Sequence, residues 1–136
     1  MKTNKIDNIL KQLELKPTSQ RVAIIDQLLK KEKMHVTAEI LRKKLEKNKI
    51  SISVATIYNN LNELAQKGYI KKVLVNKNVM WFDTNLEDHY HFYDEERNQI
   101  IDIDSSEIDF SKLPKAPKGK TTKYIDVVIH IKKLST

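Results

Sequence analysis

The spacing of apolar residues changes near Gly68, and this change constrains the fold more than any other feature of the chain. Before Gly68, apolar residues recur three or four positions apart, which is the period of helices packed against a core. After Gly68 they alternate with polar residues or form short runs, which is typical of strands. The sequence therefore predicts an α+β protein in which the helices come first.

Four helices are expected before Gly68. The first carries Ile6, Ile9, Leu10 and Leu13, and we expect Pro17 to end it. Gly68 is placed to end the fourth helix, because glycine is common just beyond a helix C-terminus. The residues that can cap the other three N-termini are Thr18 or Ser19, Thr37 and Ser53.

The segment after Gly68 predicts a hairpin and three further strands. "YIKKVLVNKNVMWFD" contains two strands around the turn "NKN", and "HYHFYD", "NQIIDID" and "KYIDVVIHIKK" follow. "SKLPKAPKGKTTK", with five lysines, is a loop between the last two strands. Helices followed by a basic hairpin are the order of a winged helix. We therefore expect a winged-helix domain at residues 1–82 and a small α/β domain at residues 83–136.

The composition excludes several classes of protein. The 136 residues include no cysteine, so disulfides, thiolate metal sites and a cysteine nucleophile are excluded. No apolar run has the length of a membrane span, and the N-terminus lacks the apolar core of a signal peptide. We expect a cytoplasmic protein with no membrane partner.

Charge divides the chain unevenly. Residues 1–81 contain 17 Lys/Arg and 7 Asp/Glu, whereas residues 82–111 contain 1 basic and 10 acidic residues. This asymmetry is typical of a polyanion-binding half joined to a cation-binding segment. A lysine-rich solvated surface is the alternative.

The fourth helix has the residue types of a helix that reads DNA. Ala55, Thr56, Asn59 and Asn60 lie near its start, where amides can pair with adenine and methyl groups can contact thymine. Tyr58 can meet a base or a phosphate. The basic residues on flanking elements, expected to contact the DNA backbone, are Lys16, Arg21, Lys71, Lys72 and Lys77. The alternative is an ordinary surface helix.

The stretch "FDTNLEDHYHF" has the features of a metal site. Asp83 is followed six and eight residues later by His89 and His91. Alternation along a strand places both imidazoles on one face, so that they can reach one ion. Nitrogen and carboxylate ligands suit Fe²⁺, Mn²⁺ or Zn²⁺. An acidic surface loop that holds two histidines is the alternative.

Five motifs in order resemble the ferric uptake regulator family of bacterial transcription factors. They are "LKPTSQRVAII", "HVTAEIL", "ISVATIYNNLNELAQKGYI", "FDTNLEDHYH" and "IIDI", and the resemblance covers about residues 5–104. It implies a homodimer that reads an inverted-repeat operator in double-stranded DNA, with residues 83–136 as the dimerisation domain. The strand "YIDVVIHI" is expected in the dimer interface.

The resemblance also implies a ligand set. Its peroxide-responsive branch (PerR) binds a metal through positions that correspond here to His35, Asp83, His89, His91 and Asp102. Most family members also bind a structural zinc through four cysteines. Here Asp94 and Arg97 occupy the positions of the first cysteine pair, so no structural zinc held by four cysteines is expected.

The cysteine-free pattern is most similar to the family's iron response regulator (Irr) branch, which leaves haem at His89 and His91 as an alternative to a divalent metal. The sequence thus predicts a metal-responsive transcriptional regulator of iron or metal homeostasis, and not an enzyme. The alternatives are a haem-responsive or peroxide-responsive regulator, a metal-dependent hydrolase, and a metal-free architectural DNA-binding protein.

Overall fold

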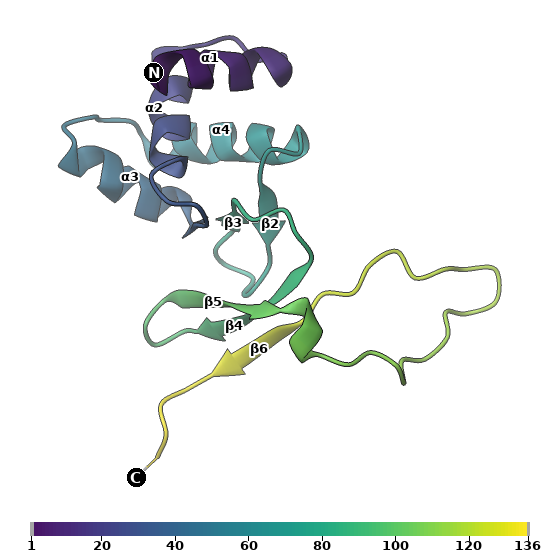
Figure 1. The fold of residues 1–136 in the computed structure, drawn as a ribbon. Coiled ribbons are helices and arrows are strands. Elements are labelled where there is room, and N and C mark those ends of the chain that lie inside the picture. Colours follow the sequence, from purple (N-terminus) through teal and green to yellow (C-terminus); the bar gives the residue numbers. More distant parts are fainter. Residues whose placement is uncertain (1, 136) are drawn as a thin grey trace. The chain divides into compact units, whose positions relative to one another are not determined.

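The computed structural model describes residues 2–135, with side chains from residue 5 onward. The chain divides into two compact units, and the boundary follows Leu86, four residues beyond the division expected from the sequence. Among the described residues, the first unit holds the α-helices and a three-stranded sheet, and the second holds another three-stranded sheet (Figure 1). The predicted α+β class is therefore confirmed. No described helix is both long enough and apolar enough to cross a membrane.

Four helices build the first unit, as expected: α1 (Lys2–Gln12), α2 (Ser19–Leu28), α3 (Ala38–Lys47) and α4 (Val54–Gln66). The last three begin at hydroxyl caps. The side chains of Thr18, Thr37 and Ser53 each accept a hydrogen bond from the backbone N–H three residues later. Such a cap satisfies a backbone donor that the helix leaves without an intrahelical partner. The three predicted helix starts are thus confirmed.

The end of α1 differs from the prediction. The helix ends at Gln12, well before Pro17, so the prediction that proline stops it was wrong. Glu14 has a left-handed backbone (φ 59°), and Leu15 N–H donates to the Leu10 carbonyl at 2.9 Å. Leu15 is buried. Burial of this leucine and the closing hydrogen bond therefore end the helix before proline can act.

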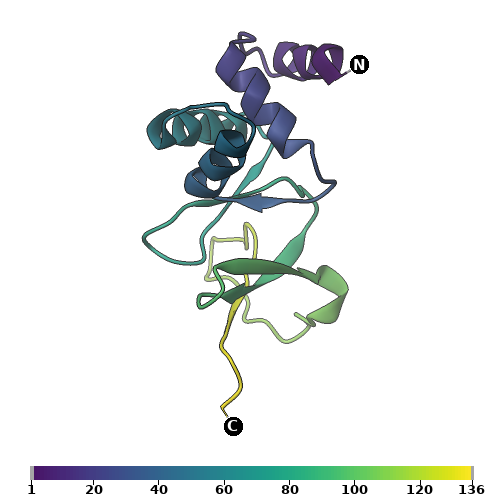
Figure 2. The ribbon, with the colours of Figure 1, turned by 90° about the vertical axis from the view of Figure 1, so that its left-hand side faces the viewer.

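The first unit has winged-helix topology. Its strands β1 (His35–Val36), β2 (Lys71–Val73) and β3 (Trp81–Asp83) pair antiparallel in the order β1-β3-β2. Residues 74–80 form the wing between β2 and β3, and the Asn76 side chain accepts hydrogen bonds from the N–H groups of Asn78 and Val79. Figure 2 shows the helices of this unit on one side of the small sheet. The predicted hairpin is confirmed.

The core of the first unit fixes the direction of α4. Ile57 and Leu61 are fully buried and share one cluster with residues of α2 and α3, among them Ile24, Ile25, Leu41 and Leu45. Burying each such side chain contributes about 1.5–3 kcal/mol. Since Ile57 and Leu61 face this core, Tyr58 and Asn59 are turned toward solvent.

The second unit is a sheet around β4. Its elements are β4 (His89–Asp94), β5 (Gln99–Asp104), the 3-10 helix η1 (Ser105–Glu107) and β6 (Val128–Ile131). β4 pairs antiparallel with β5 and parallel with β6. The three expected strands are present, but the last is shorter than "KYIDVVIHIKK": residues 123–127 and 132–133 lie outside it. Within the described residues, η1 is the helical content of this unit.

Candidate metal centre and nucleic-acid interface

A histidine and a buried carboxylate face each other in the first unit. His35 on β1 is the register partner of Asp83 on β3, and His35 Nε2 lies 3.1 Å from Asp83 Oδ2. The other carboxylate oxygen, Oδ1, accepts a hydrogen bond from Asn85 N–H at 2.8 Å. The Asp83 side chain is 1% exposed. Burying a carboxylate is costly unless it meets hydrogen-bond donors or cations. The Asp83 carboxylate is therefore placed to accept from donors or to bind a cation.

Neighbouring contacts hold this pair in place. Thr84 follows Asp83, and its hydroxyl oxygen accepts a hydrogen bond from Met34 N–H at 2.9 Å. Thr84 N–H in turn donates to the Met34 carbonyl at 3.0 Å. These two bonds connect the residue before His35 with the residue after Asp83. No local pattern in the sequence signals them, because the two segments are about fifty positions apart.

Three potential ligands converge in the second unit. His89 and His91 alternate along β4, so both side chains lie on one face, and Asp102 on β5 is the register partner of His91. Asp102 Oδ1 lies 3.3 Å from His89 Nε2 and 3.6 Å from His91 Nε2. The two Nε2 atoms are 2.9 Å apart. The register between β4 and β5 therefore brings Asp102 to both histidines.

The other nitrogen of His89 is also engaged. Its Nδ1 lies within hydrogen-bond distance of the Glu87 carbonyl oxygen. A carbonyl oxygen can only accept, so this contact favours the tautomer with the proton on Nδ1, in which the Nε2 lone pair can serve as a metal ligand. Histidines that bind metals commonly donate their second N–H in this way. Sequence reasoning missed this contact, since it involves a backbone carbonyl.

The spacing of these donors fits a small divalent ion. Ligands at the usual bond lengths of about 2.0–2.2 Å from a tetrahedral ion lie about 3.3–3.6 Å apart. The separations of 3.3 and 3.6 Å in the second unit agree with this spacing, and the two imidazoles at 2.9 Å are slightly closer. Within each unit the candidate donors lie within 4.8 Å of one another. All are nitrogen or oxygen, the donor types of Fe²⁺, Mn²⁺ and Zn²⁺ sites.

The start of α4 presents a small polar surface. Ala55, Tyr58 and Asn59 are exposed. Thr56 is half-buried, and its hydroxyl accepts a hydrogen bond from Ser53 Oγ at 2.9 Å. The Asn60 amide donates to the Thr56 carbonyl within the helix at 2.9 Å. The residues best placed to contact a base edge are therefore Ala55, Tyr58 and Asn59.

The five predicted basic contacts differ in their surroundings. Lys16, Lys72 and Lys77 are exposed, and Lys71 is half-buried. Arg21 is engaged inside the unit: its Nη2 donates to Glu63 Oε2 at 3.0 Å, and its Nη1 donates to the Lys16 carbonyl at 3.1 Å. Glu63 lies on α4. Sequence reasoning missed this partner, which is 42 positions away in the chain.

A family model described as the ferric uptake regulator family matches residues 12–130. The chain belongs to this family. The resemblance drawn from its motifs is thus confirmed, while the finer likeness to the iron response regulator branch stays a prediction. Family members are transcription regulators, and this membership rules against the hydrolase alternative.

A curated relative and several solved structures are similar to this chain. The peroxide-responsive repressor PerR of Staphylococcus aureus (strain Mu50 / ATCC 700699) is 35% identical over 94 residues, which cover 69% of this chain and 63% of the relative. The match thus spans less than two thirds of that relative's length. The Vibrio cholerae ferric uptake regulator shares 24% identity, with a TM-score of 0.79 over 93% of this chain and 98% of that one. The Francisella tularensis ferric uptake regulator with iron shares 24% identity, with a TM-score of 0.73 over 88% and 92%. These two likenesses show the fold.

Proposed function

We propose that this member of the ferric uptake regulator family is a metal-responsive transcriptional regulator that controls genes of iron or metal homeostasis. The observation that carries the proposal is the convergence of His89, His91 and Asp102, whose ligand atoms lie 2.9–3.6 Å apart. The same chain contains a winged helix with a solvent-facing reading surface. A metal site and a DNA-reading helix in one chain are the two parts that such a regulator needs.

In this proposal α4 enters the major groove. Ala55, Tyr58 and Asn59 contact base edges, with the methyl group of Thr56 beside them. The side chains proposed to contact the DNA backbone are those of Lys16, Lys71, Lys72 and Lys77, and Arg21 positions α4 through Glu63. A homodimer would place two reading helices on the halves of an inverted repeat.

The proposed ligand set joins both units. His35 and Asp83 belong to the winged helix, and His89, His91 and Asp102 belong to the second unit. We propose that all five can bind one Fe²⁺, Mn²⁺ or Zn²⁺ ion. Ligation from both units would favour one arrangement of the reading helices over others. A factor of ten in DNA affinity corresponds to about 1.4 kcal/mol of coupling free energy, and by linkage DNA changes metal affinity by the same factor.

Peroxide response is the second candidate, because the S. aureus relative carries that name and the ligand residues follow the peroxide-responsive pattern. Haem binding at His89 and His91 is the other alternative. The haem hypothesis and the divalent-metal hypothesis differ in what the purified protein contains. Haem absorbs strongly in the visible range, and a divalent ion in a nitrogen and oxygen site is found by elemental analysis.

One experiment tests the proposal as a whole. Protein purified without added metal is analysed for metal content and haem absorbance, and operator sequences are selected from a random duplex pool. DNA affinity is then measured after chelation and after adding back Fe²⁺, Mn²⁺ or Zn²⁺. We expect at least one ion to change the affinity for selected DNA. Equal affinity with and without every ion would contradict metal response and favour the architectural alternative.

A further inference from the structure

The winged helix leaves a second basic segment unexplained. Residues 112–123, here called the lysine arm, contain five lysines and no acidic residue, and they lie in the second unit. We propose that the lysine arm binds the phosphate backbone of duplex DNA in addition to the contacts made by the winged helix. The proposal rests on the DNA-binding function argued above and extends it to the second unit.

The arm is attached at both ends to the central strand of its own sheet. Residues 108–127 contain no helix or strand, and Figure 1 shows this segment extending away from the sheet of its unit. Near its start, the Phe110 ring contacts the Tyr90 ring of β4 edge-on, with centroids 5.2 Å apart. At its end, His91 N–H donates to the Val127 carbonyl at 3.2 Å. Segments of this length without regular structure are usually either functional or disordered.

Local features favour a defined shape for the arm. Pro114 and Pro117 restrict the backbone. Lys120 N–H donates to the Pro117 carbonyl at 2.9 Å, and Gly119 has φ +80°, as a type II turn requires. This turn places Lys118 and Lys120 on either side of the glycine at an exposed tip. The prolines and the turn reduce the entropy lost when the arm is ordered against a partner.

The charges of the arm are not neutralised by its own unit. All five lysines are exposed: Lys112, Lys115, Lys118, Lys120 and Lys123. Within residues 5–135, none of them forms an ion pair. The adjoining residues 87–111 contain nine acidic residues and one basic residue, yet the arm extends away from their sheet.

Duplex DNA is the partner that fits this surface. It presents a negative charge about every 1.7 Å along its axis, and lysines contact its phosphates as point charges without reading sequence. The arm contains no arginine or amide side chain, the residue types that most often read bases. The rival partner is the acidic residues 87–111 of a second copy of the chain. We favour DNA because the first unit already brings the protein to a duplex.

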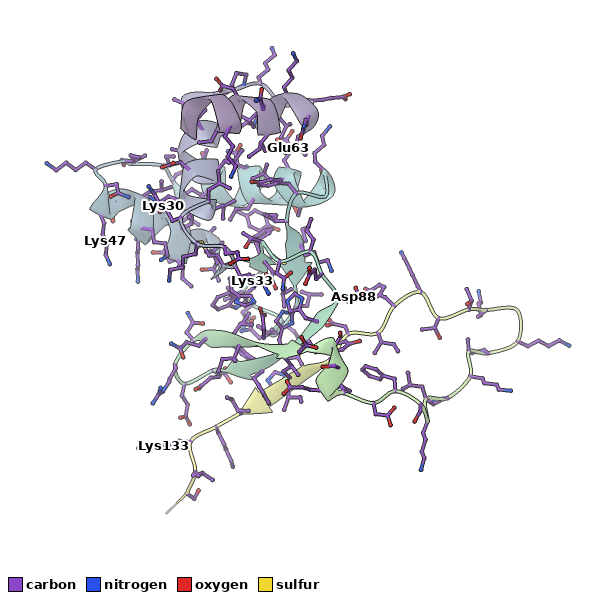
Figure 3. All side chains as sticks on the ribbon, viewed as in Figure 1. Lys30, Lys33, Lys47, Glu63, Asp88 and Lys133 are labelled. Carbon is purple, nitrogen blue, oxygen red and sulfur yellow. The ribbon has the colours of Figure 1, made fainter. Side chains whose placement is uncertain are left out.

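The test compares two variants with equal loss of charge. Lys118→Gln/Lys120→Gln changes the tip of the arm, and Lys132→Gln/Lys133→Gln changes two exposed lysines beyond β6 in the same unit. Lys133 is labelled in Figure 3. Each full-length variant binds a random-sequence duplex over a series of salt concentrations. The slope of log affinity against log salt is negative, and each lost phosphate contact reduces its magnitude by about 0.9. We expect a smaller slope for the arm variant, and a wild-type slope for the control.

The other outcomes of this comparison would contradict the proposal in different ways. Equal slopes for wild type and both variants would overturn the proposal while leaving DNA binding by the winged helix intact. Equal slopes combined with weaker self-association of the arm variant, measured by sedimentation, would assign the arm to a second copy. A lower ratio of selected-operator to random-duplex affinity would show base reading and overturn the backbone role. If the wild type binds neither duplex, the proposed function itself fails.

Discussion

His35 and Asp83 are direct partners across the β1–β3 pair, with His35 Nε2 3.1 Å from Asp83 Oδ2. The two residues are 48 positions apart in the sequence, and only the folded winged helix brings them together. The contact therefore forms only when the DNA-binding unit is folded. A ligand that binds both side chains favours the folded state of that unit.

Replacing His35 tests whether this pair takes part in metal response. We expect His35→Ala to weaken metal binding and to reduce the metal-dependent change in DNA affinity, because one nitrogen donor of the winged helix is lost. Titration calorimetry and DNA-binding assays with and without metal measure the two effects. His130→Ala is the matched control, since His130 is exposed on β6 and contacts Tyr93. Normal metal binding with full metal response in His35→Ala would make the His35–Asp83 pair structural.

The two histidines of β4 are expected to be indispensable for metal binding. His89→Ala or His91→Ala each removes one of the three donors that converge in the second unit, and with it one of the nitrogen ligands of the proposed set of five. We expect loss of high-affinity binding, measured by equilibrium dialysis, with a circular dichroism spectrum like that of the wild type. If both variants retain tight binding of Fe²⁺, Mn²⁺ and Zn²⁺, the convergence around Asp102 is a hydrogen-bonded cluster without a metal.

Exposed residues of α4 should control sequence discrimination. Tyr58 is 37% exposed, and its ring also contacts Phe82 edge-on at 6.1 Å. Loss of a base contact in Tyr58→Ala or Asn59→Ala should reduce discrimination between operator and random duplex by about 1–3 kcal/mol. Lys72→Ala should weaken both complexes about equally, because phosphate contacts carry no sequence information. Unchanged discrimination in the Tyr58 and Asn59 variants would exclude α4 as the reader.

The left-handed residue after α4 gives a test of the fold itself. Gly68 has φ +81°, and a Cβ added there would meet no atom within 4 Å. The cost of Gly68→Ala is therefore backbone strain alone, about 1–2 kcal/mol. Urea denaturation should show this decrease in the free energy of unfolding. Lys67→Ala is the neighbouring control, since Lys67 has φ −82°. Wild-type stability for Gly68→Ala would mean that the helix end relaxes.

Local features of this fold were predictable, and long-range ones were not. Thr37 and Ser53 cap the helical turn that directly follows each of them, so a short stretch of sequence is enough to predict these helix starts. The end of α1 depends on burial of Leu15 in a core built by distant residues, and proline was therefore a misleading signal. Alternation correctly placed His89 and His91 on one strand. The position of Asp102 beside them depends on strand register, which was inferred from the family and not from spacing.

The Arg21–Glu63 pair connects α2 with α4, the helix proposed to read DNA. Arg21 is 20% exposed and Glu63 is 39% exposed, so solvent screens the pair and its net contribution should be about 0.2–1 kcal/mol. Arg21 also donates to the Lys16 carbonyl, so Arg21→Ala should lower the free energy of unfolding more than Glu63→Gln does. A double-mutant cycle by urea denaturation measures the coupling between the two side chains.

The same variants separate two roles of Arg21. If Arg21 positions α4, Glu63→Gln should also weaken operator binding, although it removes a negative charge and would otherwise favour binding to phosphates. If Arg21 instead contacts phosphate directly, Glu63→Gln should strengthen binding and Arg21→Ala should reduce the magnitude of the salt slope by about 0.9. Since the guanidinium already donates to two groups of its own unit, Glu63 and the Lys16 carbonyl, we expect the first result.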